Sequence, residues 1–160
     1  MPPTKDAAPR HTIKLSSDQA FPKASISGHP VTIDYGGQEI FLGLVPFEGG
    51  LQPCKVVKQF QPPARYGYAG SEFEWFEDYY LVPFDGSRME WVSTSRGRPP
   101  PGKRPVEGGC ESDGSPLYHA IGEVDGVRTL GKVNEALGGA LFPYNGEEIM
   151  NEYYEVLCWR

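Results

Sequence analysis

The sequence predicts an all-β protein built from two β-rich repeats that share one core. Gly and Pro number 20 and 16 and aromatic residues reach 12%, a mix that suits many short strands and turns better than long helices. The stretch Gly37–Val56 returns as Gly114–Val133 at a constant offset of 77 residues (114 − 37), which indicates a duplication. With 160 residues, the repeats are expected to form a single compact domain, 1–160, since neither could cover its apolar face alone.

The chain before the first hairpin is expected to be loosely ordered and then extended. Residues 1–10 are polar and Pro-rich, which predicts a loose lead-in. Beyond them, apolar residues alternate with polar ones, and a Gly-His-Pro break interrupts the alternation. This pattern predicts short strands. The alternating apolar residues are Ile13, Leu15, Ile26, Val31 and Ile33.

Each repeat is predicted to contain two hairpins. Repeat one covers about 21–85 and repeat two about 106–160. The first hairpins turn at Glu48-Gly49 and Asp125-Gly126, and Asn145-Gly146 is a strong signal for a second turn because both residues tolerate a positive φ. The segment Tyr68–Gly70 matches Tyr144–Gly146 at an offset of 76, and Tyr79-Tyr80 matches Tyr153-Tyr154 at 74.

A connector of about 93–105 separates the repeats. Three consecutive prolines, 99–101, prevent both helix and ladder hydrogen bonding there. A polyproline ligand for a partner protein is the alternative interpretation of this stretch. The best helical candidate of the whole chain begins at Asn134, and Gly138-Gly139 should end it within two turns.

Composition and charge exclude several classes of function. The formal charge of −6 disfavours nucleic acid and anionic membranes as partners. The cysteines, Cys54, Cys110 and Cys158, have unrelated spacings, so neither a disulfide framework nor a metal site is predicted, and no cofactor is expected. No signal peptide and no apolar run of the ~18 residues that span a membrane are found. A soluble cytoplasmic protein is expected, with export by a route without a signal peptide left open.

The duplication selects the candidate site residues. Lys55 and Lys132 match without a gap, and an acid beside glycine precedes each of them: Asp34 by 21 residues and Asp113 by 19. A carboxylate accepts hydrogen bonds from neighbouring hydroxyls and an ammonium donates to hydroxyl oxygens, so the pair suits a vicinal diol of a sugar. A turn aspartate beside a solvated lysine is the structural alternative.

Catalysis is not expected. The histidines 11, 29 and 119 have no counterparts in the other repeat and no nucleophile beside them. Cys54 precedes Lys55, but its counterpart is Gly131. Several acids could form the carboxylate pair of a glycosidase, although no spacing places two of them at the required separation. These acids are Glu72, Glu74, Glu77, Asp78, Glu147 and Glu148.

An ordered series of motifs resembles the DM-nine repeat family. The motifs are "SDGSPLYHA", "GKV", "LFPYNGEE" and "YYEVLCW" in repeat two, preceded by "WV" and "PVEGG" and echoed more weakly in repeat one. The resemblance covers roughly residues 21–160. It implies two repeats related by a pseudo-twofold axis that interlock into one all-β, sandwich-like domain. It also implies a mannose-binding lectin of the innate-defence type, in which Asp113 and Lys132, and Asp34 and Lys55, contact the sugar.

We therefore expect a non-enzymatic lectin with up to two equivalent sites per chain that recognises mannose-type glycans on cell surfaces or glycoproteins, and a homodimer would double its valency. A protein–protein interaction module without a sugar ligand is the alternative, and a glycosidase is the third hypothesis.

Overall fold

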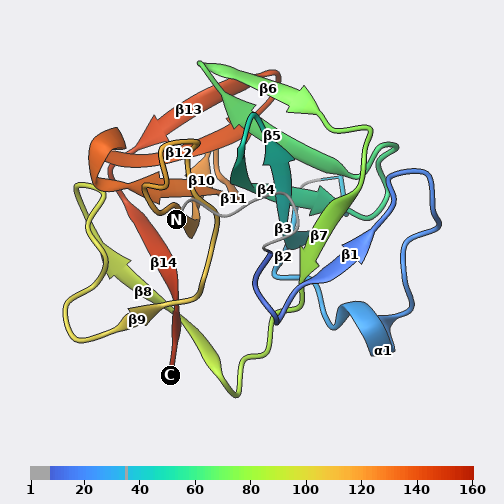
Figure 1. The fold of residues 1–160 in the computed structure, drawn as a ribbon, viewed down its shortest axis with the longest axis horizontal. Helices are drawn as coiled ribbons and strands as arrows, with labels where there is room; N and C mark the ends of the chain where they lie inside the picture. The colour runs from blue at the N-terminus through green and yellow to red at the C-terminus, as the bar shows by residue number, and fades with distance from the viewer. Residues whose placement is uncertain (1–7, 35) are drawn as a thin grey trace.

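The computed structural model describes residues 8–34 and 36–160, and it confirms the all-β prediction (Figure 1). The predicted lead-in, 1–10, lies outside the described residues as far as residue 7. The described strands form one curled antiparallel sheet of 14 strands. Their bounds are β1 Ile13–Leu15, β2 Thr32–Ile33, β3 Glu39–Phe47, β4 Gly50–Val57, β5 Ala64–Tyr68, β6 Ser71–Glu74, β7 Tyr79–Val82, β8 Met89–Thr94, β9 Arg104–Pro105, β10 Tyr118–Val124, β11 Val127–Asn134, β12 Gly139–Tyr144, β13 Glu147–Asn151 and β14 Tyr154–Trp159.

The order of strands in the sheet reads the same from either end. The first half runs β7-β3-β4-β5-β6, and the second half runs β14-β10-β11-β12-β13. The halves join where β6 meets β13, through the pairing of Ser71 with Glu147, and β1 and β8 extend the two outer edges. The resemblance led us to expect a sandwich-like domain. The structure has one continuous curled sheet, because this pairing joins the strands of the two halves. A common origin of the halves stays a prediction.

The four hairpin turns follow the chemistry of their sequences. In each turn both central residues have a positive φ, of 47° to 52° for the first residue and 77° to 88° for the glycine that follows. Turns of this kind match the twist of the strands that they join. Their central residues are Glu48-Gly49, Ala69-Gly70, Asp125-Gly126 and Asn145-Gly146.

The match between the last strands of the two halves is one residue out in the sequence comparison. Gly43 pairs with Leu81, and Ala120 pairs with Val156, so the ladders place these strands at an offset of 75 rather than 74. Tyr79 therefore corresponds to Tyr154. A shift of one residue moves a strand side chain to the opposite face, and two adjacent tyrosines in each half conceal such a shift in the sequence.

The segment before β3 differs in part from the predicted strands. Residues Ala24–Ser27 form a single helical turn, α1, which Gly28 ends with a φ of 73°. Ile26 is exposed on it. Alternation over so few residues does not distinguish a strand from one turn of helix. The candidate helix after Asn134 is a 3₁₀ turn, Glu135–Leu137, and it ends at Gly138 as expected.

The predicted connector is bounded by strands of the second half. β8 pairs along its length with β14, and β9 pairs with the end of the same strand. Residues 95–103, which include the three prolines, contain turns but no strand.

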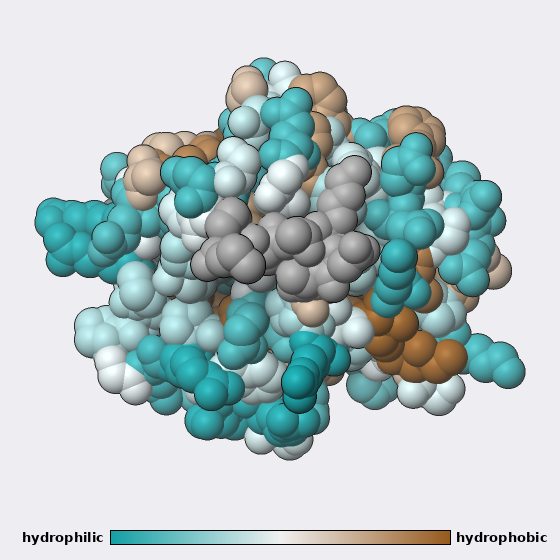
Figure 2. All heavy atoms as spheres, in the orientation of Figure 1, coloured by the Kyte–Doolittle hydropathy of each residue, from teal (hydrophilic) through white to brown (hydrophobic). Residues whose placement is uncertain are grey.

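The core has a shared part and two separate parts. The shared cluster draws on both halves, with Leu44 and Leu51 from the first and Ile121, Leu130 and Leu157 from the second. Each half also has its own cluster on the other face of its strands. The surface in Figure 2 is mainly hydrophilic, with separate hydrophobic areas, one of them near β1 and α1. None of the helices in the described residues is long or apolar enough to cross a membrane.

Candidate functional site

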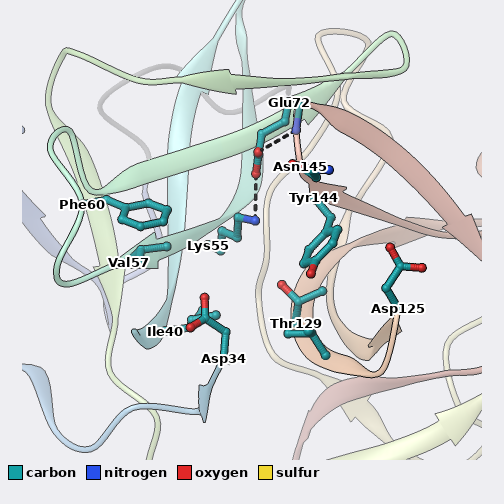
Figure 3. A pocket seen from close by; sticks show the side chains of 12 residues that line it. Asp34, Ile40, Lys55, Val57, Phe60, Glu72, Asp125, Thr129, Tyr144 and Asn145 are labelled. Atoms are coloured by element: carbon teal, nitrogen blue, oxygen red, sulfur yellow. Dashed lines mark hydrogen bonds and ion pairs between the residues drawn. The ribbon is translucent and has the colours of Figure 1, made fainter. Parts of the chain in front are cut away.

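A pocket of about 520 Å³ lies where the two halves meet (Figure 3). Both halves contribute to its walls, so the pocket depends on the way the halves interlock. In Figure 3 the first half supplies one side and the second half the other. Its lining residues are Asp34, Ile40, Lys55, Val57, Phe60, Glu72, Asp125, Val127, Thr129, Tyr144, Asn145 and Gly146.

Lys55, on β4, is held at the pocket by groups from both halves. Its Nζ atom is 2.7 Å from Glu72 Oε2 and donates to the carbonyl oxygen of Pro143 at 2.7 Å. It also lies 5.7 Å from the centroid of the Tyr144 ring, within the range of a cation–π interaction. The Lys55 and Glu72 side chains are only 9% and 14% exposed, so the pair lies largely outside bulk water.

Glu72 connects the lysine to the second half. Its Oε1 atom accepts a hydrogen bond from the backbone N–H of Gly146 at 3.2 Å, across the join between β6 and β13 (Figure 3). One carboxylate therefore neutralises a nearly buried ammonium and satisfies a turn donor of the other half.

Asp34 follows β2 and points into the same pocket (Figure 3). Its Oδ1 atom accepts hydrogen bonds from the backbone N–H groups of Gly36 and Gln38, both at 3.0 Å. The side chain therefore organises its own turn, as short acidic side chains often do. Asp34 and Lys55 therefore line one pocket, and their role in binding a ligand stays a prediction.

The opposite wall carries polar groups of the second half. Thr129, on β11, and Asp125, in the preceding turn, line the pocket beside Tyr144. Among the described residues, the buried Oγ1 atom of Thr129 has no hydrogen-bond partner. The part of the pocket lining that the structure describes thus contains three carboxyl groups, of Asp34, Glu72 and Asp125, and a single ammonium group.

A second cluster around Lys132 repeats these contacts with the halves exchanged. Lys132 Nζ is 3.4 Å from Glu148 Oε2, donates to the Gly67 carbonyl at 2.9 Å and lies 5.4 Å from the Tyr68 ring centroid. Glu148 accepts from the backbone N–H of Gly70 at 3.3 Å. Every one of these groups matches one around Lys55 at an offset of 76 or 77.

Asp113 lies apart from these contacts. It is exposed, and its Oδ1 atom accepts from the hydroxyl and the backbone N–H of Ser115 at 2.7 and 2.9 Å. The Ser115 hydroxyl and then its backbone N–H hold the pKa of Asp113 below its ordinary value. One predicted Asp/Lys pair therefore lines a common pocket, although its members bind other groups, and the contacts described for Lys132 do not include Asp113.

A comparison with known families identifies the family of the chain. Residues 34–151 match the DM9 repeat. The chain belongs to the DM9 repeat family. Its fold is similar to the crystal structure of the nematode sperm cell motility protein MFP2B, with a TM-score of 0.66 and 15% sequence identity. The match covers 93% of this chain but 46% of MFP2B, so this DM9 chain spans about half of that protein. No curated protein matches the sequence.

Sequence reasoning does not identify the roles of four residues around Lys55 and Lys132. Glu72 and Glu148 resemble solvated hairpin acids, yet each neutralises a lysine. The offset of 76 that matches the two hairpins also matches these glutamates, and this signal could have found them. Gln52 and Thr129, each three residues before a lysine, differ between the halves, so a search for identical residues passes over them.

Cys54 and His119, a thiol and a base considered in the sequence, are both buried. Burial raises the pKa of the Cys54 thiol well above its ordinary range. Burial also lowers the pKa of His119 to about 3, with a smaller effect of nearby His11. Residues 8–34 and 36–160 contain no group of three or more His, Cys, Asp or Glu side chains that could hold a metal ion.

Proposed function

We propose that this DM9 protein is a non-enzymatic carbohydrate-binding protein that takes mannose or mannose-rich glycans in the pocket of Asp34 and Lys55. The observation that carries the proposal is that this acid and this lysine line one pocket together with an aromatic ring. The carboxylate accepts from sugar hydroxyls, and the ammonium donates to their oxygens. Tyr144 offers a surface for the C–H groups of the sugar.

The charges of the pocket support a neutral ligand. Three carboxyl groups face one ammonium group, so an anionic sugar or a phosphate would be repelled. A hexose carries no charge and offers many hydroxyl groups. Because such a ligand gives up strong hydration, we expect a dissociation constant of roughly millimolar to micromolar.

The pair of Asp113 and Lys132 belongs to the same proposal as a second, weaker candidate. The sequence motifs around it are closer to the family pattern than those of the first pair. Its lysine, however, already has protein partners, and its aspartate is bound to Ser115. Testing both pairs separately decides which of them binds.

Calorimetry with mannose, after a glycan array has identified binding, tests the proposal. Asp34→Asn and Lys55→Met should each raise the dissociation constant by about ten- to a hundredfold, because a hydrogen bond to a charged group contributes ~1.5–3 kcal/mol. Glu152→Gln, which neutralises an exposed acid, serves as the control and should bind normally. Unchanged affinity of both Asp34→Asn and Lys55→Met would place the site elsewhere.

A protein–protein interaction module is the second candidate function. Phe76 is 67% exposed and Tyr153 is 83% exposed, and large exposed rings are typical of contact surfaces. Silence of a folded protein on a broad glycan array would favour this alternative. Release of product from a glycan would instead favour the glycosidase hypothesis.

A further inference from the structure

Strands β4 and β11 contact each other, and each carries a polar residue three positions before its lysine. On β4 the residue is Gln52, before Lys55, and on β11 it is Thr129, before Lys132. Each reaches across to the lysine cluster of the other strand. Gln52 contacts Lys132, and Thr129 lines the pocket of Lys55. The two clusters therefore differ at one matched position, with a long amide in one and a short hydroxyl in the other.

The amide completes the coordination of Lys132. An ammonium group has three N–H donors. Lys132 Nζ donates to Gln52 Oε1 at 2.7 Å and to the Gly67 carbonyl at 2.9 Å, and it forms an ion pair with Glu148 at 3.4 Å. The Lys132 and Glu148 side chains are each 5% exposed. Three groups of the described residues therefore surround this ammonium, and its side chain offers little surface to a ligand.

The ammonium of Lys55 has one protein partner fewer. Its Nζ atom donates to the Pro143 carbonyl and forms an ion pair with Glu72. Thr129 stands where an amide would supply the third partner, and its own buried hydroxyl has no hydrogen-bond partner among the described residues. A ligand with adjacent hydroxyl groups could accept from Lys55 and bond to Thr129 at once.

Contacts with the segment that contains Cys110 and Glu111 hold Gln52 in position. Leu51 exchanges two backbone hydrogen bonds with Cys110, at 2.8 and 2.9 Å, and Gln52 Nε2 donates to Glu111 at 3.3 Å. The close contact between this segment and β4 depends on Gly109, because a Cβ atom there would collide with the Leu51 carbonyl. The loop that carries Asp113 is thus fastened to β4 beside the amide.

We propose that Gln52 closes the Lys132 cluster from within, and that Thr129 leaves the Lys55 pocket open and contributes its hydroxyl to the ligand. The chain then has a single open site. The identity of the ligand as a sugar rests on the proposed function, whereas the closure by Gln52 does not.

Reductive methylation with formaldehyde tests the closure without any ligand. With mass spectrometry as the readout and exposed Lys14 as the internal reference, Lys132 should react more slowly than Lys55 in the natural chain. Gln52→Thr should accelerate Lys132 and leave Lys55 unchanged, and Thr129→Gln should slow Lys55. Gln52→Ser repeats the first test if Gln52→Thr folds poorly. Continued protection of Lys132 in a folded Gln52 variant overturns the closure.

Calorimetry with mannose tests the ligand contact. One site per chain is expected, with loss of binding in Thr129→Gln and weaker binding in the isosteric Thr129→Val, while Thr129→Ser retains binding. Two sites in the natural chain, or full affinity of Thr129→Val, would contradict the inference. Absence of mannose binding in every variant, together with the expected methylation pattern, would reject the proposed function and keep the closure.

Discussion

At the scale of the residue, two lysines of the DM9 chain are removed from water and depend on their partners. A buried charge is tolerated only when it is paired and hydrogen-bonded. Lys132 meets this condition with a glutamate, an amide and a carbonyl. Lys132 is therefore important for the stability of the fold, and it is buried rather than solvated as the structural alternative expected.

Lys132→Met should destabilise the fold by about 3 kcal/mol, because it leaves Glu148 buried without its counter-ion. Lys55→Met should cost roughly half as much, since Glu72 is more accessible to water. Urea denaturation measures both. The double change Lys132→Met with Glu148→Leu should recover part of the loss. A Lys132→Met protein as stable as the exposed control Lys14→Met would contradict this view.

His119 should make stability depend on pH. Its pKa is about 3 in the fold, because burial disfavours the charged ring, against ~6.5 in the unfolded chain. Between these values only the unfolded state binds the proton, so this contribution to stability is complete above pH 6.5 and is lost as the pH falls towards 3.

We expect roughly 2–3 kcal/mol of loss between pH 7.5 and pH 4.5 from this residue. His119→Leu removes the titrating ring and should flatten that part of the profile. Urea denaturation at both pH values gives the difference between the natural chain and the variant. Parallel pH profiles of the two proteins would show that His119 is not responsible.

At the scale of the element, the hairpins follow local sequence rules. Asn145-Gly146 and Asp125-Gly126 are residues that tolerate a positive φ, and the structure has them in turns. Glu48 and Ala69 are exceptions, since they adopt φ values of 47° and 51° without the side chain of Asn or Asp to compensate.

Ala69→Asn should therefore raise the free energy of unfolding by ~0.5–1 kcal/mol, because Asn adopts the left-handed region at lower cost. Gly146→Ala is the matched opposite change, at a φ of 83°, and should lower it. Thermal and urea denaturation report both effects. Equal stability of Ala69→Asn and the natural chain would indicate that the turn relaxes without cost.

The predictable part of this protein is the part encoded locally. Turn residues reveal the hairpins, and a constant offset reveals the paired lysines. The partners of Lys55 and Lys132 are less accessible to such reasoning because the carbonyls and rings come from the other half, 64 to 89 residues away in the chain. The hydrophobic periodicity of the strands does not show how the two halves pack against each other. Gln52 and Thr129 matter because they differ between the halves, and a search for repeated residues passes over such positions.

At the scale of the whole molecule, the two halves share their central core. Leu44 and Leu130 belong to one cluster although they come from different halves. Each half presents one face of its strands to that cluster and the other to its own. The halves should therefore unfold together rather than one after the other.

Leu130→Ala should cost about 2–5 kcal/mol and shift the unfolding of both halves equally, because its side chain is fully buried in the shared cluster. Fluorine NMR of 5-fluorotryptophan protein follows Trp75 in the first half and Trp159 in the second during urea denaturation. Coincident midpoints in both the natural chain and the variant are expected. Separate midpoints would show two independently stable halves.

The mirrored order of the sheet has a consequence for what one half can do by itself. A lone half contains a lysine and a glutamate but lacks the ring and the carbonyl that face them, which lie in the opposite half. Two separate copies of a single half could form the two lysine clusters only with identical residues in both. Joining both halves in one chain removes that constraint, because residues 52 and 129 are encoded independently. A fused chain can seal one cluster for stability and keep the other accessible, a division of labour that a symmetric dimer of single repeats cannot reach.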